Sequence, residues 1–559
     1  MSPVLDALRS HLPVLAVLLP AFTAIALLLF PGAEGHTMHA DAGLRRRRWL
    51  SLASVALGVA IALSLLGRAA AGELIVYRLG DWPAPFGIVL VVDRLAALML
   101  LLAQLVALPV LWYACGGWDT HGRHFHALFQ FQLMGLAGAF VTGDLFNLFV
   151  FFEVLLIASY VLLVHGQGEA RIRAGVHYVV LNLAASALFL VALALVYATL
   201  GTLNMADLAQ RAAAVAPEQA SLVQAAALLL LVVFGFKAAL APLHLWLPAT
   251  YAAASAPVAA LFAIMTKVGA YSIVRVHTTV FGTDGGRAVA AAEPWLLPLA
   301  IATSVLGVAG ALAANTMGRM VGYLNVSSVG TILIGVGLYD EGAMSAALFY
   351  MGHSTLVVAA LFLLVELVGS QRGDMRDRLR PAAPLAQPLM LGLMLLLGAG
   401  SVAGLPPLPG FLGKVMLMQS AAGLASQAWV WASVLGVGFL TLIGLARAGS
   451  ILFWSVRGDL PRGGMAHASG AGAHLVGPTV ALLLGGVLMA VFAGPLTRYT
   501  AAAAAQLGDR AAYAEAVLGG QGAAASTTRP YDGRIGGPAA GSTEHPLKRA
   551  QPLQQEPHR

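Results

Sequence analysis

Long stretches of apolar residues, separated by short polar connections, make up most of this chain. Each stretch has the roughly 18–25 residues that a helix needs to cross a bilayer, and counting them gives about 14 spans. The pattern therefore predicts an all-α polytopic membrane protein. The predicted spans are Leu12–Phe30, Trp49–Leu66, Ile88–Tyr113, His126–Val141, Leu145–Val164, Val176–Tyr197, Leu222–Ala254, Pro257–Thr278, Trp295–Ala314, Met320–Leu338, Met344–Leu367, Leu389–Ala421, Trp429–Trp454 and Val476–Phe492.

Two of these spans carry prolines in their middle. The seventh contains Pro242 and Pro248, and the twelfth contains Pro406, Pro407 and Pro409. Proline removes a backbone donor and interrupts a helix, so helices 7 and 12 are predicted to be discontinuous. Two broken helices at corresponding places, five helices apart, are typical of inverted-repeat transporters, whose binding sites lie at such breaks. The alternative is a pair of ordinary proline kinks.

Basic residues cluster in the loops that follow odd-numbered spans. Arg45–Arg48 follow the first span, Arg171 and Arg173 the fifth, and Arg372 to Arg380 the eleventh. The positive-inside rule places these loops in the cytoplasm and both chain termini outside. The same clustering explains the net charge of +7 without nucleic-acid binding.

Composition agrees with a membrane class, since 59% of the 559 residues are hydrophobic and 10% are charged. The single cysteine, Cys115, excludes intrachain disulfides, thiolate-ligated iron–sulfur clusters and covalent c-type haem, so no cofactor is expected. After residue 500 the chain becomes rich in Ala and Gly and then polar, which predicts disorder. The predicted organisation is helices 1–3 (1–125), a core of helices 4–13 (126–460), helix 14 (461–499) and a disordered polar tail (500–559).

Three of the four lysines, Lys237, Lys267 and Lys414, lie inside apolar spans. Arginine keeps its proton in proteins, whereas a buried lysine can release it. An ionisable group at bilayer depth is costly and therefore indicates function. These lysines therefore predict a protein that moves protons. The alternative for Lys267 is a side chain that snorkels to the membrane interface, and the alternative for Lys414 is a charge that offsets freed backbone carbonyls.

Other candidates share the same depth. Glu153 is the acid deepest in an apolar run and is expected to partner Lys237, either as a static ion pair or as a coupled proton site. His353 and, less strongly, His244 have side chains suited to proton transfer, although a packing role is the alternative. Arg447 can set a field but cannot relay protons, and Glu366 is expected to form a surface salt bridge.

Four segments resemble the proton-translocating membrane subunits shared by respiratory complex I and Mrp-type cation/proton antiporters. They are GDLFNLFVFFEVLLIASYVLL, FGFKAALAPLHLWLPATYAAASAPVAALFAIMTKVGAYSIVR, ANTMGRMVGYLNVSSVG and GLPPLPGFLGKVML. Within the family, the string LHLWLPATYAAASAPVAALFAIMTKVGAYSIVR looks most like the D subunit of the Mrp (Pha) antiporters, since complex I subunits usually have an Asp at the position of Ala249. The resemblance implies 14 helices with inverted repeats of five, a Glu–Lys pair at Glu153 and Lys237, a central Lys267 and a terminal Lys414. It departs at Val357, where many relatives carry a lysine one turn after the histidine that corresponds to His353.

Two functions follow as hypotheses, beside a third reading as a structural membrane scaffold without conduction, which leaves the three buried lysines unexplained. The favoured one is a subunit of a hetero-oligomeric secondary transporter in the bacterial inner membrane, which exchanges Na+ or K+ for protons through Glu153, Lys237, Lys267, His353 and Lys414. The alternative is a proton-pumping membrane subunit of an NADH:quinone oxidoreductase or membrane-bound hydrogenase, with catalysis in other subunits.

Overall fold

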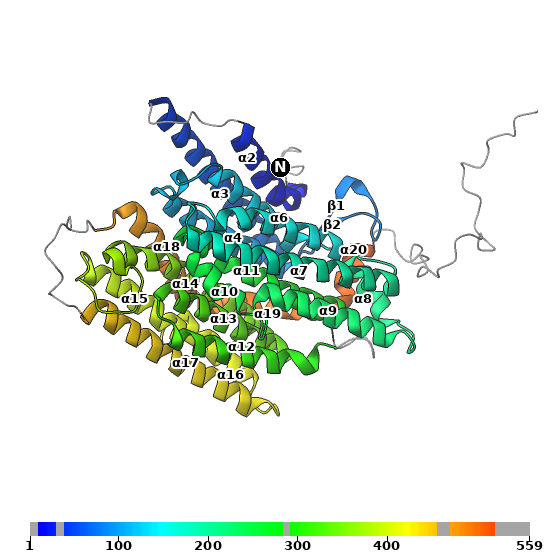
Figure 1. The fold of residues 1–559 in the computed structure, drawn as a ribbon. Helices are drawn as coiled ribbons and strands as arrows, with labels where there is room; N and C mark the ends of the chain where they lie inside the picture. Colours follow the sequence, from blue (N-terminus) through cyan, green and yellow to red (C-terminus); the bar gives the residue numbers. More distant parts are fainter. Residues whose placement is uncertain (1–8, 30–37, 283–290, 456–469, 520–559) are drawn as a thin grey trace, which may run out of the picture.

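The computed structural model describes residues 9–29, 38–282, 291–455 and 470–519, most of which are helical. Twelve described helices are long and apolar enough to cross a membrane, and Phe125–Val141 and Pro388–Ala403 are shorter apolar helices. Most helices run roughly left to right in Figure 1 and lie side by side in both views. The predicted all-helical membrane architecture is confirmed, whereas the count of fourteen crossings and the inverted repeats stay predictions.

A helix, or a pair of helices, corresponds to each predicted span. In chain order they are α2 (Leu12–Leu29), α3 (Met38–Ala70), α4 (Arg94–Ala114), α5 (Phe125–Val141), α6 (Leu145–Leu163), α7 (Glu169–Leu200), α9 (Ala220–Ala238) with α10 (Trp246–Ala253), α11 (Ala256–Val274), α12 (Glu293–Ala313), α13 (Met317–Gly337), α14 (Glu341–Ser370), α15 (Pro388–Ala403) with α16 (Pro409–Ser420), α17 (Gln427–Gly449) and α18 (Ala473–Val491).

Shorter elements connect or extend these helices. They are the strands β1 (Ile75–Arg78) and β2 (Val89–Val92), the short helices η1 (Leu79–Asp81), η2 (Trp118–Thr120), α8 (Met205–Ala213) and η4 (Gly373–Met375), and the π-helical segments η3 (Arg275–Val280) and η5 (Ser450–Trp454) that continue α11 and α17. The two strands form an antiparallel hairpin before α4, with Ile75 opposite Val92. The sequence pattern did not predict this hairpin.

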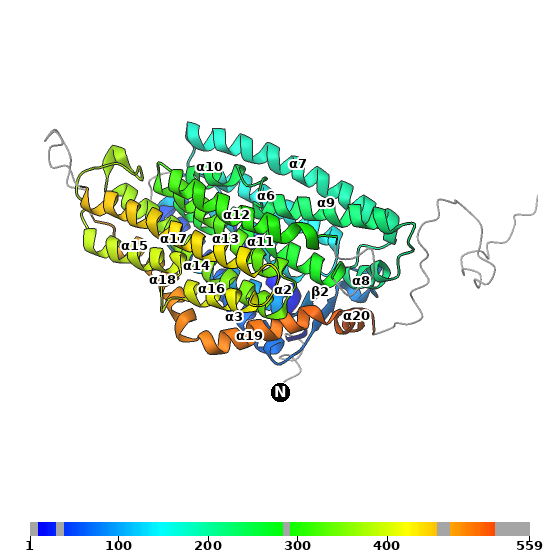
Figure 2. The same cartoon turned by 90° about the horizontal axis from the view of Figure 1, so that it is seen from below.

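The predicted start of the disordered tail at residue 500 is wrong. Residues up to Leu518 form two helices, α19 (Ala493–Gly508) and α20 (Arg510–Leu518), which lie along one side of the bundle in Figure 2. Tyr499 Oη donates to the carbonyl of Arg94 at 2.9 Å, and Arg510 Nε donates to the carbonyl of Thr279 at 3.0 Å. Alanine-rich sequence is strongly helix-forming, and these contacts hold it against the bundle. Residues 520–559 lie outside the described residues.

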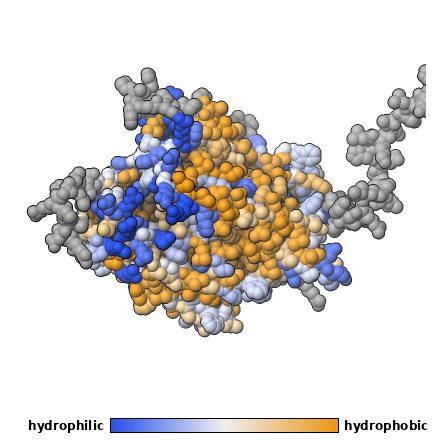
Figure 3. All heavy atoms as spheres, viewed as in Figure 1, coloured by the Kyte–Doolittle hydropathy of each residue, from blue (hydrophilic) through white to orange (hydrophobic). Residues whose placement is uncertain are grey.

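Three helices form the centre of the described bundle. In α11 all of the eighteen most apolar consecutive residues are buried, and in α13 and α14 94% of them are, against 67% or less in every other candidate span. Figure 3 shows the outside of the bundle, where hydrophobic residues cover most of one face and hydrophilic residues gather at its left-hand end. Ionisable groups on the three central helices are therefore shielded from lipid.

The seventh and twelfth spans are broken in closely similar ways. The helix α9 ends at Ala238, Ala239 adopts a left-handed conformation (φ 62°), and the Leu240 amide bonds the Gly235 carbonyl at 2.7 Å. The helix α15 ends at Ala403, Gly404 is left-handed (φ 87°), and the Leu405 amide bonds the Gly400 carbonyl at 2.9 Å. Both predicted discontinuities are present.

The prolines occupy positions where a missing donor costs little. Pro242, Pro406 and Pro407 lie between the two halves of their spans, Pro248 is in the first turn of α10, and Pro409 begins α16. The first turn of a helix has no intrahelical acceptor for its amides, so proline is tolerated there. The prolines therefore end one half-helix and permit the next to begin.

Candidate functional site

Glu153 and Lys237 are connected through a serine hydroxyl. Ser186 on α7 donates from Oγ to Glu153 Oε1 at 2.5 Å. Lys237 Nζ lies 3.4 Å from the same Ser186 Oγ and 3.4 Å from Asn182 Oδ1, also on α7. The described residues contain no direct ion pair between Glu153 and Lys237, so the predicted contact is corrected to a three-member chain from α6 through α7 to α9.

Lys237 occupies the last turn of α9, immediately before the break. It is 5% exposed, and its ammonium lies 5.9 Å from the centre of the Phe152 ring. Gly269 of α11 lets this turn approach closely, since a Cβ there would lie 2.4 Å from the Ala238 nitrogen. The lysine therefore lies where α9 touches the central helix that carries Lys267. Its contacts in the described part of the chain are the neutral side chains of Asn182 and Ser186 and the Phe152 ring.

Lys267 is fully buried at the middle of α11. Its ammonium donates to Asn325 Oδ1 at 2.6 Å and to Ser328 Oγ at 3.3 Å, both on α13. Asn325 is itself held by a 3.4 Å bond from its amide to Thr266 Oγ1. Within the described ranges no carboxylate contacts this lysine, which makes it a buried amine held by neutral acceptors. Its depth excludes the snorkelling alternative.

His353 lies on α14 and is 1% exposed. Its Nδ1 is 3.5 Å from Ser401 Oγ, and within the described part of the chain its Nε2 has no hydrogen-bond partner. Ser401 lies on α15, whose carbonyls at Val402 and Ala403 accept hydrogen bonds from Lys414. Gly410 of α16 makes room for the His353 ring, because a Cβ there would lie 2.8 Å from Nε2. His353 is therefore packed against α15 and α16, the two halves of the twelfth span, and its place in a proton route stays a prediction.

Lys414 has backbone partners instead. Its Nζ donates to the carbonyls of Ala403 at 2.8 Å and Val402 at 3.1 Å, in the last turn of α15. Gly404 permits the approach, since a Cβ there would lie 2.9 Å from Lys414 Cδ. Those carbonyls carry the partial negative charge of a helix C-terminus. The geometry is that of the alternative in which Lys414 offsets freed backbone carbonyls.

The two weaker candidates, His244 and Arg447, make no hydrogen bond to Glu153, Lys237, Lys267 or His353 within the described residues. His244 is 6% exposed in the break of the seventh span, and its Nδ1 has no hydrogen-bond partner among the described residues. Arg447 lies on an exposed part of α17 and donates to the carbonyl of Leu312 in α12 at 3.2 Å. The first is a buried imidazole beside a break, and the second connects two helices at the surface.

Sequence reasoning missed the neutral partners of the lysines. Ser186, Asn182, Asn325 and Ser328 hold the ammonium groups, yet each is a single small polar residue in an apolar helix. Such residues are common in membrane helices and bond across helix interfaces. Their signal is spacing, since Asn182 and Ser186 are four residues apart and Asn325 and Ser328 are three apart, so that each pair lies on one face of its helix.

A cavity of about 800 Å³ opens at one end of the three central helices. We call it the Trp118 cavity, and its walls include Trp118, Arg171, Ser255, Ala259, Gly318 and Glu366. Glu366 accepts a 2.6 Å hydrogen bond from Trp118 Nε1, and no salt bridge to it is present in the described part of the chain. Its expected role as a surface salt-bridge residue is therefore wrong. The cavity begins about 12 Å from Lys267, the eight residues of α11 between Ala259 and Lys267.

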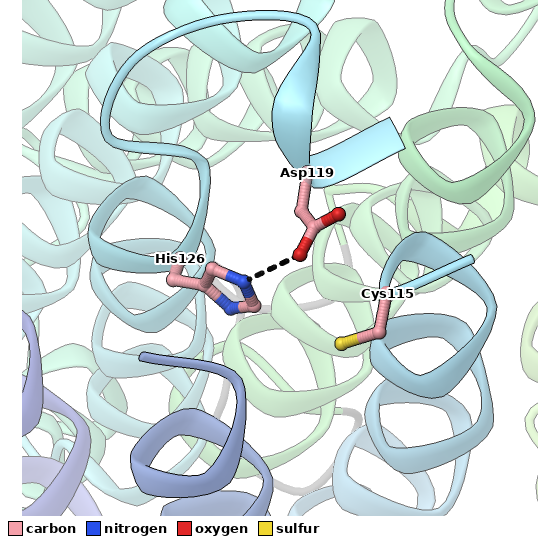
Figure 4. A group of neighbouring side chains, drawn as sticks. All are labelled: Cys115, Asp119 and His126. Carbon is pink, nitrogen blue, oxygen red and sulfur yellow. Dashed lines mark hydrogen bonds and ion pairs between the residues drawn. The ribbon is translucent and has the colours of Figure 1, made fainter. Parts of the chain in front are cut away.

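Cys115, Asp119 and His126 form the one group of described residues whose donor atoms lie close enough together for a metal ion, all within 4.8 Å (Figure 4). Arg48 donates to both oxygens of Asp119 at 2.6 and 2.8 Å, and His126 Nε2 lies 3.1 Å from the same carboxylate. Burial and the neighbouring Asp119 charge raise the pKa of the Cys115 thiol to about 12. A metal needs a thiolate and a free carboxylate, so this group is an ion-pair cluster.

Comparison with known proteins places these features in a family. A sequence profile described as NADH:quinone oxidoreductase/Mrp antiporter, TM, matches residues 142–442. The D subunit of a probable K(+)/H(+) antiporter from Rhizobium meliloti is 42% identical over 91% of this chain and 97% of its own length. The D subunit of a Na(+)/H(+) antiporter from Alkalihalophilus pseudofirmus is 36% identical over 91% and 99%.

Solved structures agree. A chain of the Mrp complex from Dietzia sp. is similar with a TM-score of 0.80 and 27% identity, over 91% of this chain and 99% of that one. A chain of respiratory complex I from Thermus thermophilus has a TM-score of 0.73 at 24% identity, over 89% and 99%, which shows the shared fold. The chain therefore belongs to the family of NADH:quinone oxidoreductase and Mrp antiporter membrane subunits, and within it to the D subunits of the multi-subunit Mrp antiporters.

Proposed function

We propose that this chain conducts protons for a multi-subunit antiporter of the bacterial inner membrane, which exports Na+ or K+ while protons move inward. The observation that carries the proposal is the row of buried ionisable groups on separate helices, Glu153, Lys237, Lys267 and His353. Such groups are expensive at membrane depth and mark ion pathways. The relatives named as D subunits of Na(+)/H(+) and K(+)/H(+) antiporters support the exchange reaction.

The residues have different roles in this proposal. Lys237 and Lys267 bind and release protons, because their partners are neutral side chains that tolerate either state. Glu153 controls the charge of Lys237 through Ser186, since an ionised carboxylate favours the ammonium and its neutralisation favours release. His353 passes protons beyond Lys267 and replaces the lysine that relatives carry at the position of Val357. Lys414 ends the row as a fixed positive charge.

The Trp118 cavity supplies the cytoplasmic opening of the route. It lies at the ends of α11, α13 and α14 that adjoin the Arg-rich loops, which the charge distribution places inside. The chain itself catalyses no covalent reaction in this proposal, and both of its termini lie outside. The partner subunits supply the route of the cation.

Transport by variants of the assembled complex tests the proposal. In everted membrane vesicles, Lys237→Ala and Glu153→Ala should each reduce the pH change driven by Na+ or K+ by about a hundredfold, a loss typical of removing a proton-transferring side chain. Blue-native electrophoresis confirms assembly. Full activity in either assembled variant would refute the assignment.

The partners separate this function from the redox-driven alternative. Purification from native membranes in mild detergent, followed by mass spectrometry, should identify small polytopic antiporter subunits. Recovery of flavin and iron–sulfur subunits in their place would assign the same row of residues to a redox-driven pump.

A further inference from the structure

A second cavity opens at the opposite end of the central helices. Its volume is about 210 Å³, room for several waters at roughly 30 Å³ each. We call it the His277 cavity. It is lined by His277 and Thr278 of η3, Tyr339, Asp340 and Glu341 before and at the start of α14, and the α19–α20 region from Ala504 to Arg510.

His277 is the unusual residue of this cavity. It is 1% exposed, and within the described residues neither of its ring nitrogens has a hydrogen-bond partner. The Tyr339 hydroxyl in the same lining is also buried without a partner there. Buried polar groups in proteins are nearly always satisfied, by water where no protein partner exists. Two such groups facing one hollow therefore indicate a hydrated site.

The backbone around His277 departs from a regular α-helix. The last turn after α11 is π-helical, with the Phe281 amide bonded five residues back to the Val276 carbonyl at 2.9 Å. Single π-helical turns are rare and occur often at functional sites. Arg510 of α20 donates to the carbonyls of Thr279 at 3.0 Å and Val280 at 2.9 Å. The C-terminal segment is thereby attached over the cavity as its roof.

The same three helices extend from one cavity to the other. The helix α11 runs from the Trp118 cavity at Ala259 to the His277 cavity, and α13 and α14 also have one end in each. Lys267 lies between them, about 12 Å along α11 from Ala259 and about 15 Å from His277 at 1.5 Å per residue. Lys267 is thus a buried ionisable group about midway between the two openings.

From this arrangement we infer that the His277 cavity is the outer proton-binding site of the chain, where the His277 imidazole takes protons from cavity water and delivers them through water toward Lys267. One ring nitrogen binds the incoming proton while the other releases its own, so the ring returns to its neutral form. The inference rests on the proposed function for its direction, and the acids of the loop before α14 place this opening outside by the charge pattern.

The charged surroundings suit an imidazole that exchanges protons. Asp340 and Glu341 line the same cavity, and Arg510 closes it. Asp207 and Arg211 of α8, which packs against η3, form their own ion pair at 3.0 Å. Arg275 is paired with Asp93 at 2.6 Å and thus occupied. The carboxylates in the lining attract protons from outside toward the ring.

Sidedness of water access is the first test. In a Cys115→Ala background, Thr278→Cys in the His277 cavity and Ala170→Cys in the Trp118 cavity are treated with a membrane-impermeant thiol reagent. Thr278→Cys should react in right-side-out vesicles and Ala170→Cys only in inside-out vesicles. Reaction of Thr278→Cys only from the inside, or from neither side, overturns the proposal.

The ring is tested by His277→Gln, which keeps a polar group but cannot bind the proton. Cation-driven proton exchange by the assembled complex should fall about tenfold or more. Ala505→Trp, which fills the cavity from its roof and leaves the ring in place, should cause a similar loss and covers the case of a His277→Gln complex that does not assemble. Full exchange in either assembled variant overturns the proposal. Lys237→Ala serves as the reference variant. Full exchange in Lys237→Ala would refute the proposed function, whereas the thiol labelling would still show whether the His277 cavity opens to the outside.

Discussion

The two broken helices have the same backbone and different lysine chemistry. At both breaks a residue with positive φ ends the first half, and the following amide bonds the carbonyl five residues back. Lys237 precedes its break and contacts the side chains of Asn182 and Ser186. Lys414 follows its break and donates to the carbonyls of Val402 and Ala403.

Under the proposed function, this difference in partners distinguishes a lysine that exchanges protons from one that stays charged. A serine hydroxyl can turn and an amide can rearrange, so the surroundings of Lys237 adapt to a neutral amine. Backbone carbonyls at a helix end keep their partial negative charge and hold a cation in place. At the end of α15 the freed carbonyls accept from the Lys414 ammonium, and in the break after α9 the Ala241 amide donates to Thr303 Oγ1 at 2.8 Å.

The largest expected difference between the two breaks is in the effect of replacing each lysine by arginine on proton exchange. Arginine keeps the charge and cannot release its proton. Lys237→Arg should therefore reduce exchange about a hundredfold, and Lys414→Arg should retain most of it. Proton fluxes measured with a pH-sensitive dye in vesicles compare the two directly. Equal losses would show that Lys414 also exchanges protons and would end the distinction.

Removing the charge at the twelfth span should affect stability. Lys414→Ala leaves two buried carbonyls without their cationic donor, at a cost of about 2 kcal/mol. The purified complex should unfold at a lower temperature, which differential scanning fluorimetry measures. Lys237→Ala is the matched control and should change the unfolding temperature less, because its partners can bond one another. An unchanged midpoint for Lys414→Ala would contradict the structural role.

The bridging hydroxyl at the seventh span has a smaller predicted effect. Ser186→Ala removes the connection between Glu153 and Lys237 and leaves both side chains in place. Exchange should fall about tenfold, which corresponds to about 1.4 kcal/mol, the order expected for hydrogen bonds to charged groups. Ser159→Ala is a suitable control, since that serine bonds Tyr178 away from the lysine. Unchanged exchange in Ser186→Ala would show that Glu153 acts without this bridge.

The smallest effect on exchange is expected at Thr303, whose hydroxyl accepts the hydrogen bond from the Ala241 amide. Thr303→Val removes the oxygen that bonds the Ala241 amide and preserves the shape of the side chain. Stability should decrease by about 1 kcal/mol, with little change in exchange. Thermal unfolding and vesicle assays on the same preparation measure both. A large loss of exchange at normal stability would assign Thr303 to the pathway.

Much of this arrangement follows from the sequence, and the limits have physical causes. Apolar length predicts the spans, and Pro242 and Pro406 predict the breaks, because both are local properties of the chain. The partners of the lysines depend on which helix faces are adjacent, and Asn325 carries no local sign of that. The helices α19 and α20 were missed because alanine-rich sequence was interpreted as low complexity. His277 was missed because the cavity that defines it is closed by those same helices.

The orientation of the Ser186 O–H bond has a further consequence for proton transfer. It donates toward Glu153 while its oxygen faces Lys237. If a proton passes through this hydroxyl, the O–H bond ends up pointing the other way, and no second proton follows until the group has rotated back. Under the proposed function, this hydroxyl would pass one proton for each reorientation of its O–H bond. Threonine keeps a hydroxyl whose O–H bond turns about Cβ–Oγ, whereas alanine has none, so Ser186→Thr should retain exchange that Ser186→Ala loses.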